Sequence, residues 1–489
     1  MTALTNCSKA LNKSLDFKTI YNSLAYLYIS LFIVLGLIIG FSPVIYALFF
    51  LTAVIFILPA HLLGIQIIVF MTMIFERWFT LAPLITEYAI YKIYPLDVII
   101  LIAISGWLIN QLFFKKNVII FGWPEKLLGL FIIITVIYLI RSFFEINADI
   151  EIAISTFKNY AFYPLLYFLI IYSVQTTKQF KNILHTMLLA GVMIIGFIAI
   201  GWLRGQGLWT EYTPLSTYGI RFLAGSQAFY LMITVLLSLG LLAFERFKNQ
   251  GLASVIIIIW LIGLAVSLMR HLWLSLFIGL IFLLTIIPAV NKKNLIKLSL
   301  KSSLIIITLA IIALLIANIS PWANFSDSLD NFYKTFSTRI TSLISVSQDT
   351  SLNWRLNFWR TAEKSWIKNP ITGLGFGQKL PLELGQWQTF EEIRNIHNSP
   401  LAIIIQMGLI GISLFTLFIA TNLASSFKLI FKNEELAPYY LGLLAAIVAM
   451  FFASLFQPYL ETNLTSIFFY LLLGLLRTNL IINGQKEKI

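Results

Sequence analysis

The stretch RNIHNSPLAIIIQMGLIG, residues 394–411, places a histidine directly before a long apolar run. The run continues to about residue 420, and roughly 20 apolar residues are enough for a helix to cross a bilayer. Similar runs recur along almost the whole chain, which is 59% hydrophobic and only 11% charged. A soluble globular surface is therefore excluded. Because backbone groups in a bilayer must bond within their own segment, the sequence predicts an all-α, polytopic transmembrane helical bundle.

About fourteen spans are predicted from the apolar runs. They lie near residues 23–41, 43–59, 61–76, 94–114, 126–142, 160–175, 184–202, 222–244, 252–269, 272–290, 302–318, 399–420, 437–456 and 464–480. The predicted organisation is a cytoplasmic N-terminus at 1–22, spans 1–11 within 23–318, one large partly helical extracytoplasmic loop at 319–398, spans 12–14 within 399–480, and a cytoplasmic C-terminus at 481–489. The single cysteine, Cys7, excludes an intrachain disulfide and a multi-cysteine metal site.

The distribution of cations predicts the orientation of the chain. More than half of the 34 lysine and arginine residues fall in segments that share one side if the N-terminus is cytoplasmic, as the positive-inside rule requires. The net charge of +13 is then mostly explained by cations that fix the orientation of the chain and contact membrane lipid headgroups. No nucleic-acid partner is expected. In this topology Arg221, Arg270, the long loop and His397 all lie on the outer side.

The long loop contains a segment with helical periodicity, NWRLNFWRTAEKSWIKNP at residues 353–370. Trp354, Phe358, Ala362 and Trp366 recur every fourth residue and form one apolar stripe, while Arg355 lies off that stripe. The next segment, ITGLGFGQ at residues 371–378, contains three glycines at alternate positions. It is predicted to form a turn where the backbone comes close to another group.

His397 stands just before the predicted twelfth span. Ser399 is predicted to be the N-cap of that helix and Pro400 its first helical residue. A helix N-terminus attracts anions, and a nearby imidazole can accept or donate a proton near neutral pH. The simpler interpretations are a satisfied interfacial histidine and, for Arg270, a side chain that snorkels to the headgroups. An arginine in or beside a membrane span costs free energy, and such residues usually bind a substrate or form an ion pair. A role of this kind is therefore a second hypothesis for Arg270.

These motifs, in this order, resemble the O-antigen ligase and O-antigen polymerase superfamily of bacterial membrane glycosyltransferases. The resemblance covers about residues 215–420 and includes SLMRHLWLS, NWRLNFWRTAEKSWIKNPITGLGFG and HNSPLAIIIQMGLIG. Its most specific element is His397 and Asn398 followed by Gly408. The family's other site residues fall on Arg221 in YGIRFLAGSQAFY, on Arg270, and on Arg355 with Trp359. Two departures are the absence of a small residue after Arg270 and of an asparagine in GSQAF.

The resemblance implies transfer of an undecaprenyl-pyrophosphate-linked glycan to an acceptor sugar hydroxyl on the outer side of the cytoplasmic (inner) membrane. Arg221, Arg270 and Arg355 would bind the leaving pyrophosphate, because one guanidinium group can donate two parallel hydrogen bonds to phosphate oxygens. His397 would handle the acceptor proton in an inverting displacement. Neither a metal nor another cofactor is expected. Asn398, Gly408 and Trp359 would support the site.

Several alternatives stay open at the level of sequence. A flippase for lipid-linked oligosaccharides, or another polysaccharide transporter, suits a many-span bundle but would predict charges at mid-span and internal repeats. A non-catalytic scaffold, with polysaccharide-assembly partners, would leave the outer Arg and His cluster without a purpose. A polymerase is slightly favoured over a ligase by the span count and the single large loop. The acceptor would be a lipid-linked repeat unit, a lipid A core sugar or a protein hydroxyl.

Overall fold

The structure is a computed structural model, and most of its residues are helical. It describes residues 21–32, 34–35, 39, 42–75, 79–85, 90–114, 121–145, 148–204, 225–297, 350–384 and 387–486. The chain divides into two compact units, one of Met1–Val118 with Tyr172–Ala190 and one of Ile119–Ile171 with Gly191–Ile489. The predicted span at 302–318, six residues of the span at 23–41, and Arg221 lie outside the described residues.

The first unit is a small group of apolar helices. It contains α2 (Pro43–Ile57), α3 (His61–Ile74), α4 (Pro95–Phe114) and the first part of α8 (Thr177–Arg204). Helix α4 packs against both α2 and α3. A short antiparallel hairpin, β1 (Leu84–Ile85) and β2 (Ile90–Tyr91), precedes α4.

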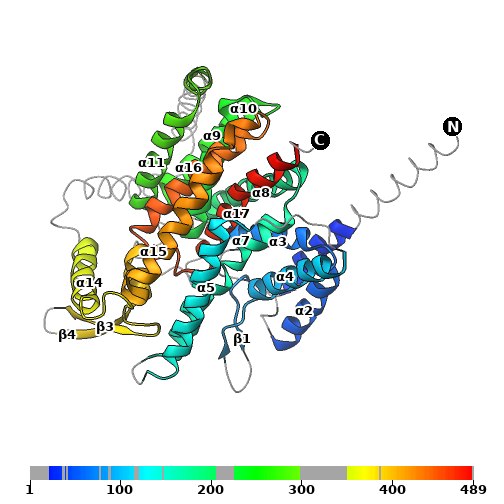
Figure 1. The fold of residues 1–489 in the computed structure, drawn as a ribbon. Helices are drawn as coiled ribbons and strands as arrows, with labels where there is room; N and C mark the ends of the chain where they lie inside the picture. The colour runs from blue at the N-terminus through cyan, green and yellow to red at the C-terminus, as the bar shows by residue number, and fades with distance from the viewer. Residues whose placement is uncertain are drawn as a thin grey trace, which may run out of the picture. The chain divides into compact units, whose positions relative to one another are not determined.

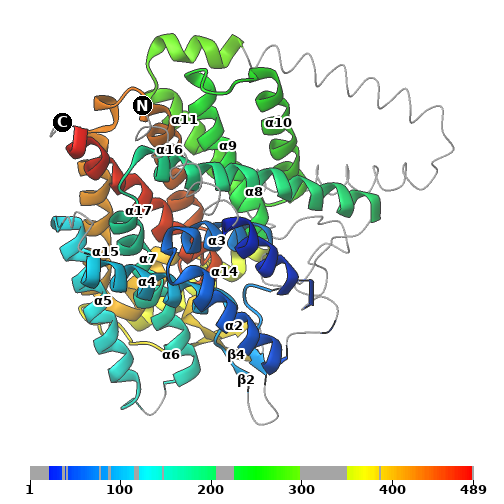
Figure 2. The same cartoon turned by 90° about the vertical axis from the view of Figure 1, so that its right-hand side faces the viewer.

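The second unit holds most of the remaining helices. These are α5 (Trp123–Ser142), α6 (Ile150–Phe157), the π-helical turn η1 (Lys158–Phe162), α7 (Leu165–Ser173), α9 (Gly225–Ala243), α10 (Gln250–Val266), α11 (Arg270–Ile286), α15 (Ser399–Phe427), α16 (Ala437–Ser454) and α17 (Asn463–Lys486). Helix α16 packs against α9 and α11, and α15 runs along α5 (Figures 1 and 2). Leu236 and Ala445 lie in this core, because α9, α16 and α17 are apolar on every side and buried along most of their length.

Within the predicted long loop the structure describes a helix and a hairpin. Helix α14 (Thr350–Trp366) confirms the helix expected from the periodicity. Phe358 and Ala362 from its apolar stripe are buried in a small core, with Trp354 and Trp366 packed against it. The antiparallel hairpin of β3 (Lys379–Leu384) and β4 (Trp387–Glu392) was not predicted, and it lies next to α14 (Figure 1). The two hairpins, β1–β2 and β3–β4, depart from the predicted all-α fold.

Seven of the described helices are long and apolar enough to cross a membrane: α4, α5, α8, α9, α15, α16 and α17. Four more, α2, α3, α10 and α11, are apolar but shorter, with 17 residues or fewer. All of these helices coincide with predicted spans, because an apolar run in the sequence is enough to locate a spanning helix. The total of fourteen spans and the extracytoplasmic placement of the loop stay predictions.

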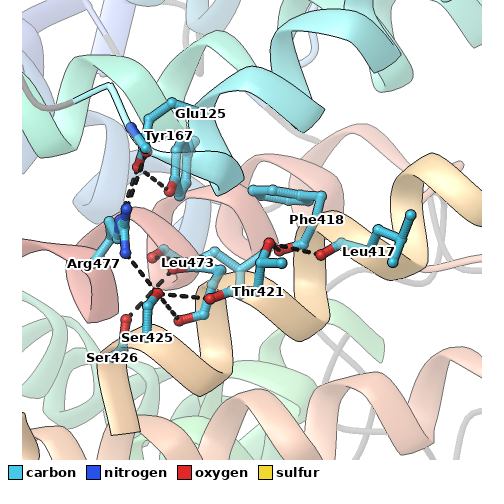
Figure 3. A network of polar contacts seen from close by, with 11 residues as sticks. Glu125, Tyr167, Leu417, Phe418, Thr421, Ser425, Ser426, Leu473 and Arg477 are labelled. Carbon is cyan, nitrogen blue, oxygen red and sulfur yellow. Dashed lines mark hydrogen bonds and ion pairs between the residues drawn. The ribbon is translucent and has the colours of Figure 1, made fainter. Parts of the chain in front are cut away.

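A buried ion pair and its hydrogen bonds connect four helices of the second unit. Arg477 of α17 binds both carboxylate oxygens of Glu125 near the start of α5, at 2.8 and 3.0 Å. Arg477 also donates to Ser425 of α15, and Tyr167 of α7 donates to Glu125 (Figure 3). Glu125 is fully buried and Arg477 is 4% exposed. The charge of Arg477 is therefore satisfied inside the protein and not by membrane lipid headgroups.

Candidate active site

His397 lies between a short 3-10 turn, Ile393–Asn395, and the first residue of α15. Its φ is +56°, in the left-handed region that a residue other than glycine adopts at a cost of about 1–2 kcal/mol. Such conformations persist where the surrounding contacts hold them and are concentrated at functional sites. The prediction that α15 begins directly after His397 is confirmed.

The predicted cap of α15 is off by one residue. Asn398, rather than Ser399, is the N-cap, and its side-chain oxygen accepts from the backbone amide of Leu401 at 3.0 Å. Ser399 is instead fully buried, and its hydroxyl donates to Glu461 at 2.5 Å. The Ser399 hydroxyl also accepts from the backbone amide of Leu460 at 3.1 Å. Its bonds therefore run to the segment between α16 and α17, and Asn398 caps the helix.

The imidazole of His397 is held by two contacts. Its Nδ1 lies 2.8 Å from Oε1 of Gln457, in the loop between α16 and α17. Trp354 of α14 meets the ring edge-on, with the centroids 5.6 Å apart and the planes at 84°. Burial lowers the pKa of His397, and the positive charge of Arg355 lowers it further, while the bond to Gln457 partly offsets both. The ring is therefore kept neutral at neutral pH, as a proton acceptor must be.

A second histidine approaches the same site from α11. His271 Nε2 lies 2.7 Å from the hydroxyl of Tyr459, and Phe229 of α9 packs on the Tyr459 ring with centroids 4.7 Å apart. Burial raises the pKa of Tyr459, and the charge of Arg355 partly offsets that rise. Arg355 is thus close enough to act on both Tyr459 and His397. Arg270 is the first residue of α11 and directly precedes His271.

Glu461 forms a buried polar centre beneath His397. Its two carboxylate oxygens accept from Ser399 and from Tyr160, each at 2.5 Å. Asn159 donates to the backbone carbonyl of Glu461 at 2.6 Å. Asn159 and Tyr160 both belong to the π-helical turn η1, whose wider turn is typical of functional sites. Burial raises the pKa of Glu461 to about 7, despite these hydrogen bonds.

A break in α15 receives the glycine-rich turn of the loop. Gly408 has φ +62° and ψ −161°, so the amides of Leu409 and Ile410 lose their helical acceptors. They donate instead to the carbonyls of Pro370 and Ile371, at 2.9 and 3.3 Å. The carbonyls of Ile405 and Gln406, which those two amides would bond in a helix, accept from Leu374 and Gly375 at 2.8 and 3.0 Å. The inserted turn therefore replaces each missing helical bond.

Only glycine fits where these two backbones meet. A Cβ atom on Gly408 would lie 2.1 Å from the carbonyl oxygen of Ile371, and one on Gly373 would lie 2.6 Å from the amide nitrogen of Gly408. The prediction of close backbone approach at the glycine turn is confirmed. Trp359 of α14 adds a further link, because its Nε1 donates to the carbonyl of Ile396 at 2.8 Å.

The second unit thus brings together most of the predicted site residues. His397 and Arg355 lie close to one another, with Trp359 and Asn398 supporting the backbone on either side of His397. Arg270 directly precedes His271, whose ring contacts the hydroxyl of Tyr459. Arg221 lies outside the described residues. Gly225 of the same motif begins α9, and a Cβ there would lie 2.5 Å from Cε of Met269, next to Arg270.

Four residues of the site were missed in the sequence. They are His271, Gln457, Tyr459 and Glu461. His271 occupies the position where the family pattern expects a small residue, and that departure was the available signal. The other three lie in FQPYLET, a short polar segment between the last two spans that has no distinctive periodicity.

The comparison with protein families adds independent support. Residues 253–416 match the model of the O-antigen ligase family. The match covers about a third of the chain and supports its resemblance to the O-antigen ligase and polymerase superfamily. The matched residues of this O-antigen ligase domain include Arg270, Arg355, His397 and Gly408. At the level of the family the match supports a membrane glycosyltransferase of the O-antigen ligase type. No curated protein sequence matches the chain.

Proposed function

We propose that the chain transfers a glycan from undecaprenyl pyrophosphate to an acceptor sugar hydroxyl on the outer side of the cytoplasmic membrane, with inversion at the anomeric carbon. The observation that carries the proposal is the convergence of a neutral imidazole, His397, with the guanidinium of Arg355 and the start of α11 at Arg270. These groups come from three separate parts of the sequence.

In the proposed reaction the bond between the anomeric carbon and the pyrophosphate breaks as the acceptor oxygen forms its bond. Arg355, Arg270 and Arg221 stabilise the charge that develops on the leaving pyrophosphate. His397 accepts the proton of the acceptor hydroxyl and needs to be neutral to do so. Three cations supply enough charge to replace a divalent metal, so transfer is expected to persist in excess chelator.

His397→Ala tests this proposal in purified protein supplied with an undecaprenyl-pyrophosphate glycan and its acceptor. Transfer is expected to fall by about 100-fold or more, the usual contribution of a general base. The amount of folded protein should stay close to wild type. His185→Ala, an exposed histidine in α8, is the matched control and should keep full activity. Full transfer by His397→Ala, or strict dependence on magnesium or manganese, would contradict the proposal.

The alternative function is a flippase or other transporter of lipid-linked polysaccharide precursors. Such a protein would move the labelled donor across vesicles without forming a new glycosidic bond, and His397→Ala would leave that movement unchanged.

Within the enzyme proposal, a polymerase and a ligase differ in acceptor. Mass analysis of surface polysaccharide from a strain lacking the chain separates them. Single repeat units on the surface indicate a polymerase, and unattached polymer indicates a ligase.

A further inference from the structure

The segment between α16 and α17 supplies three side chains to the site, at every second residue. Gln457 contacts His397, Tyr459 contacts His271, and Glu461 contacts Ser399, at 2.8, 2.7 and 2.5 Å. The segment lies about 60 residues beyond His397 and beyond the O-antigen ligase match, which ends at residue 416. Its contribution to the site is visible only in the folded chain.

The backbone of this segment is fastened to the start of α15. The hydroxyl of Ser399 accepts from the amide of Leu460 at 3.1 Å while it donates to Glu461. The amide of Tyr459 donates to the carbonyl of Gln457 at 2.8 Å, which closes a tight turn around Pro458. Gln457 is thereby fixed relative to His397 by contacts that do not involve its own side chain.

The contact between Gln457 and His397 determines which ring nitrogen carries the proton. The carboxamide oxygen of Gln457 faces Nδ1, and an oxygen of this kind can only accept. Nδ1 must then donate, and a neutral imidazole has a single N–H. The lone pair is therefore on Nε2.

We propose that Gln457 is a positioning residue that holds His397 in the tautomer protonated on Nδ1, so that Nε2 is the atom that accepts the acceptor proton. This inference rests on the proposed role of His397 as the base. It assigns to a neutral amide the orienting function that a carboxylate performs in many catalytic triads.

The charge on the partner at position 457 is expected to set the pH range of activity. Arg355 faces the ring from α14 and lowers the pKa of His397, and Trp354 covers the ring from the same helix. On the side of α15, Ser399 bonds to the buried carboxyl group of Glu461. A carboxylate at position 457 would oppose Arg355 and raise the pKa of His397. An apolar side chain there would remove the bond to Gln457, which now raises that pKa.

The experiment compares Gln457→Glu, Gln457→Leu and, as a matched control, Gln378→Leu. Gln378 makes one side-chain bond, to Glu145 at 3.0 Å, and lies outside the site. Gln457→Glu should move the acid limb of the pH–rate profile to higher pH by about one unit. Gln457→Leu should lower kcat about ten-fold or more with little change in KM. Gln378→Leu should match wild type in both.

A second measurement reports the tautomer without any activity. The chain has four histidines, so the ¹⁵N resonances of His397 can be assigned by difference with His397→Ala. Wild type should show the proton on Nδ1, and Gln457→Leu should show a mixture of tautomers. A proton on Nε2 in wild type would overturn the inference. So would Gln457 variants that match wild type in kcat and pH profile while His397→Ala is inactive. Full activity of His397→Ala would instead overturn the proposed function.

Discussion

Arg355 and Arg360 lie on the same helix, α14, yet only Arg355 is expected to bind the donor. Arg355 is half-buried and acts on both His397 and Tyr459, whereas Arg360 is exposed. The planar guanidinium group of arginine can donate two hydrogen bonds to a pyrophosphate at once. The ammonium group of lysine cannot reproduce that geometry. The consequences of replacing each arginine should therefore differ sharply.

Arg355→Lys and Arg270→Lys should each reduce kcat/KM by about 10- to 100-fold, because losing one charge-assisted hydrogen bond costs about 1.5–3 kcal/mol. Arg360→Lys is the matched control on the same helix and should keep near-normal transfer. Initial rates with a radiolabelled donor measure the effect. Near-normal rates for both lysine variants would leave these arginines with headgroup contact alone.

Glu461 should make the stability of the protein depend on pH. Its pKa in the folded state, about 7, lies above the usual value of 4.5, so the folded protein holds a proton that the unfolded chain releases. Stability contributed by this group therefore falls as pH rises from about 4.5 to 7. In Glu461→Gln this fall should disappear. The melting temperature of the variant minus that of wild type should rise between pH 5 and pH 8, and a constant difference would contradict the assignment.

At the scale of elements, α15 and the glycine turn form one structure built from two distant segments. The break at Gly408 occurs nine residues after Ser399, about 14 Å along the helix. Tyr138 of α5 braces the junction, since its hydroxyl donates to the carbonyl of Thr372 and lies 3.3 Å from that of Met407. Through this junction the loop that carries Arg355 is attached to α15, which begins just after His397.

Gly408→Ala should prevent this junction from forming, because the added Cβ would lie 2.1 Å from a carbonyl oxygen and the φ of +62° is unfavourable for alanine. We expect a melting temperature in detergent lower by several degrees, together with loss of transfer. Gly129→Ala is the matched control, since Gly129 lies in α5 with no atom within 4 Å of the added Cβ. That variant should be as stable as wild type or about 1 kcal/mol more stable.

At the scale of the whole molecule, a buried ion pair and an exposed ion pair of the second unit contribute differently to stability. Glu125 and Arg477 are both buried, so removing either partner leaves an unpaired charge inside the protein. The exposed pair of Lys379 and Asp149, in contrast, stays largely in solvent. The surrounding dielectric determines what each pair contributes to stability.

Arg477→Met should lower the free energy of unfolding by about 3–5 kcal/mol, the usual cost of an orphaned buried charge. Lys379→Met should cost less than about 1 kcal/mol, as exposed pairs generally do. Denaturant titration of the purified protein in detergent measures both. Equal effects of the two variants would mean that the Glu125 carboxylate finds another partner.

The sequence by itself determined the membrane bundle, because a helix that crosses a bilayer requires a local run of apolar residues. Such a run can be recognised wherever it occurs in the sequence. The sequence also located α14 by periodicity, the glycine turn, and the start of α15 directly after His397. The distribution of cations predicted that Arg270, the loop with Arg355, and His397 lie on one side of the membrane. Their assignment to one site came from resemblance to a family. The O-antigen ligase match then supported that family over residues 253–416.

Only the tertiary structure decided what each helix end contacts. Asn398 caps α15, while Ser399 bonds to Glu461, which lies 62 residues further along the chain. Gln457 meets His397, and Arg477 meets Glu125 across 352 residues. Such contacts depend on how helices pack, and a hydrogen bond leaves no periodic trace in the sequence around either partner. The apolar runs set which segments are helices, while the few polar side chains among them find partners only when the helices assemble.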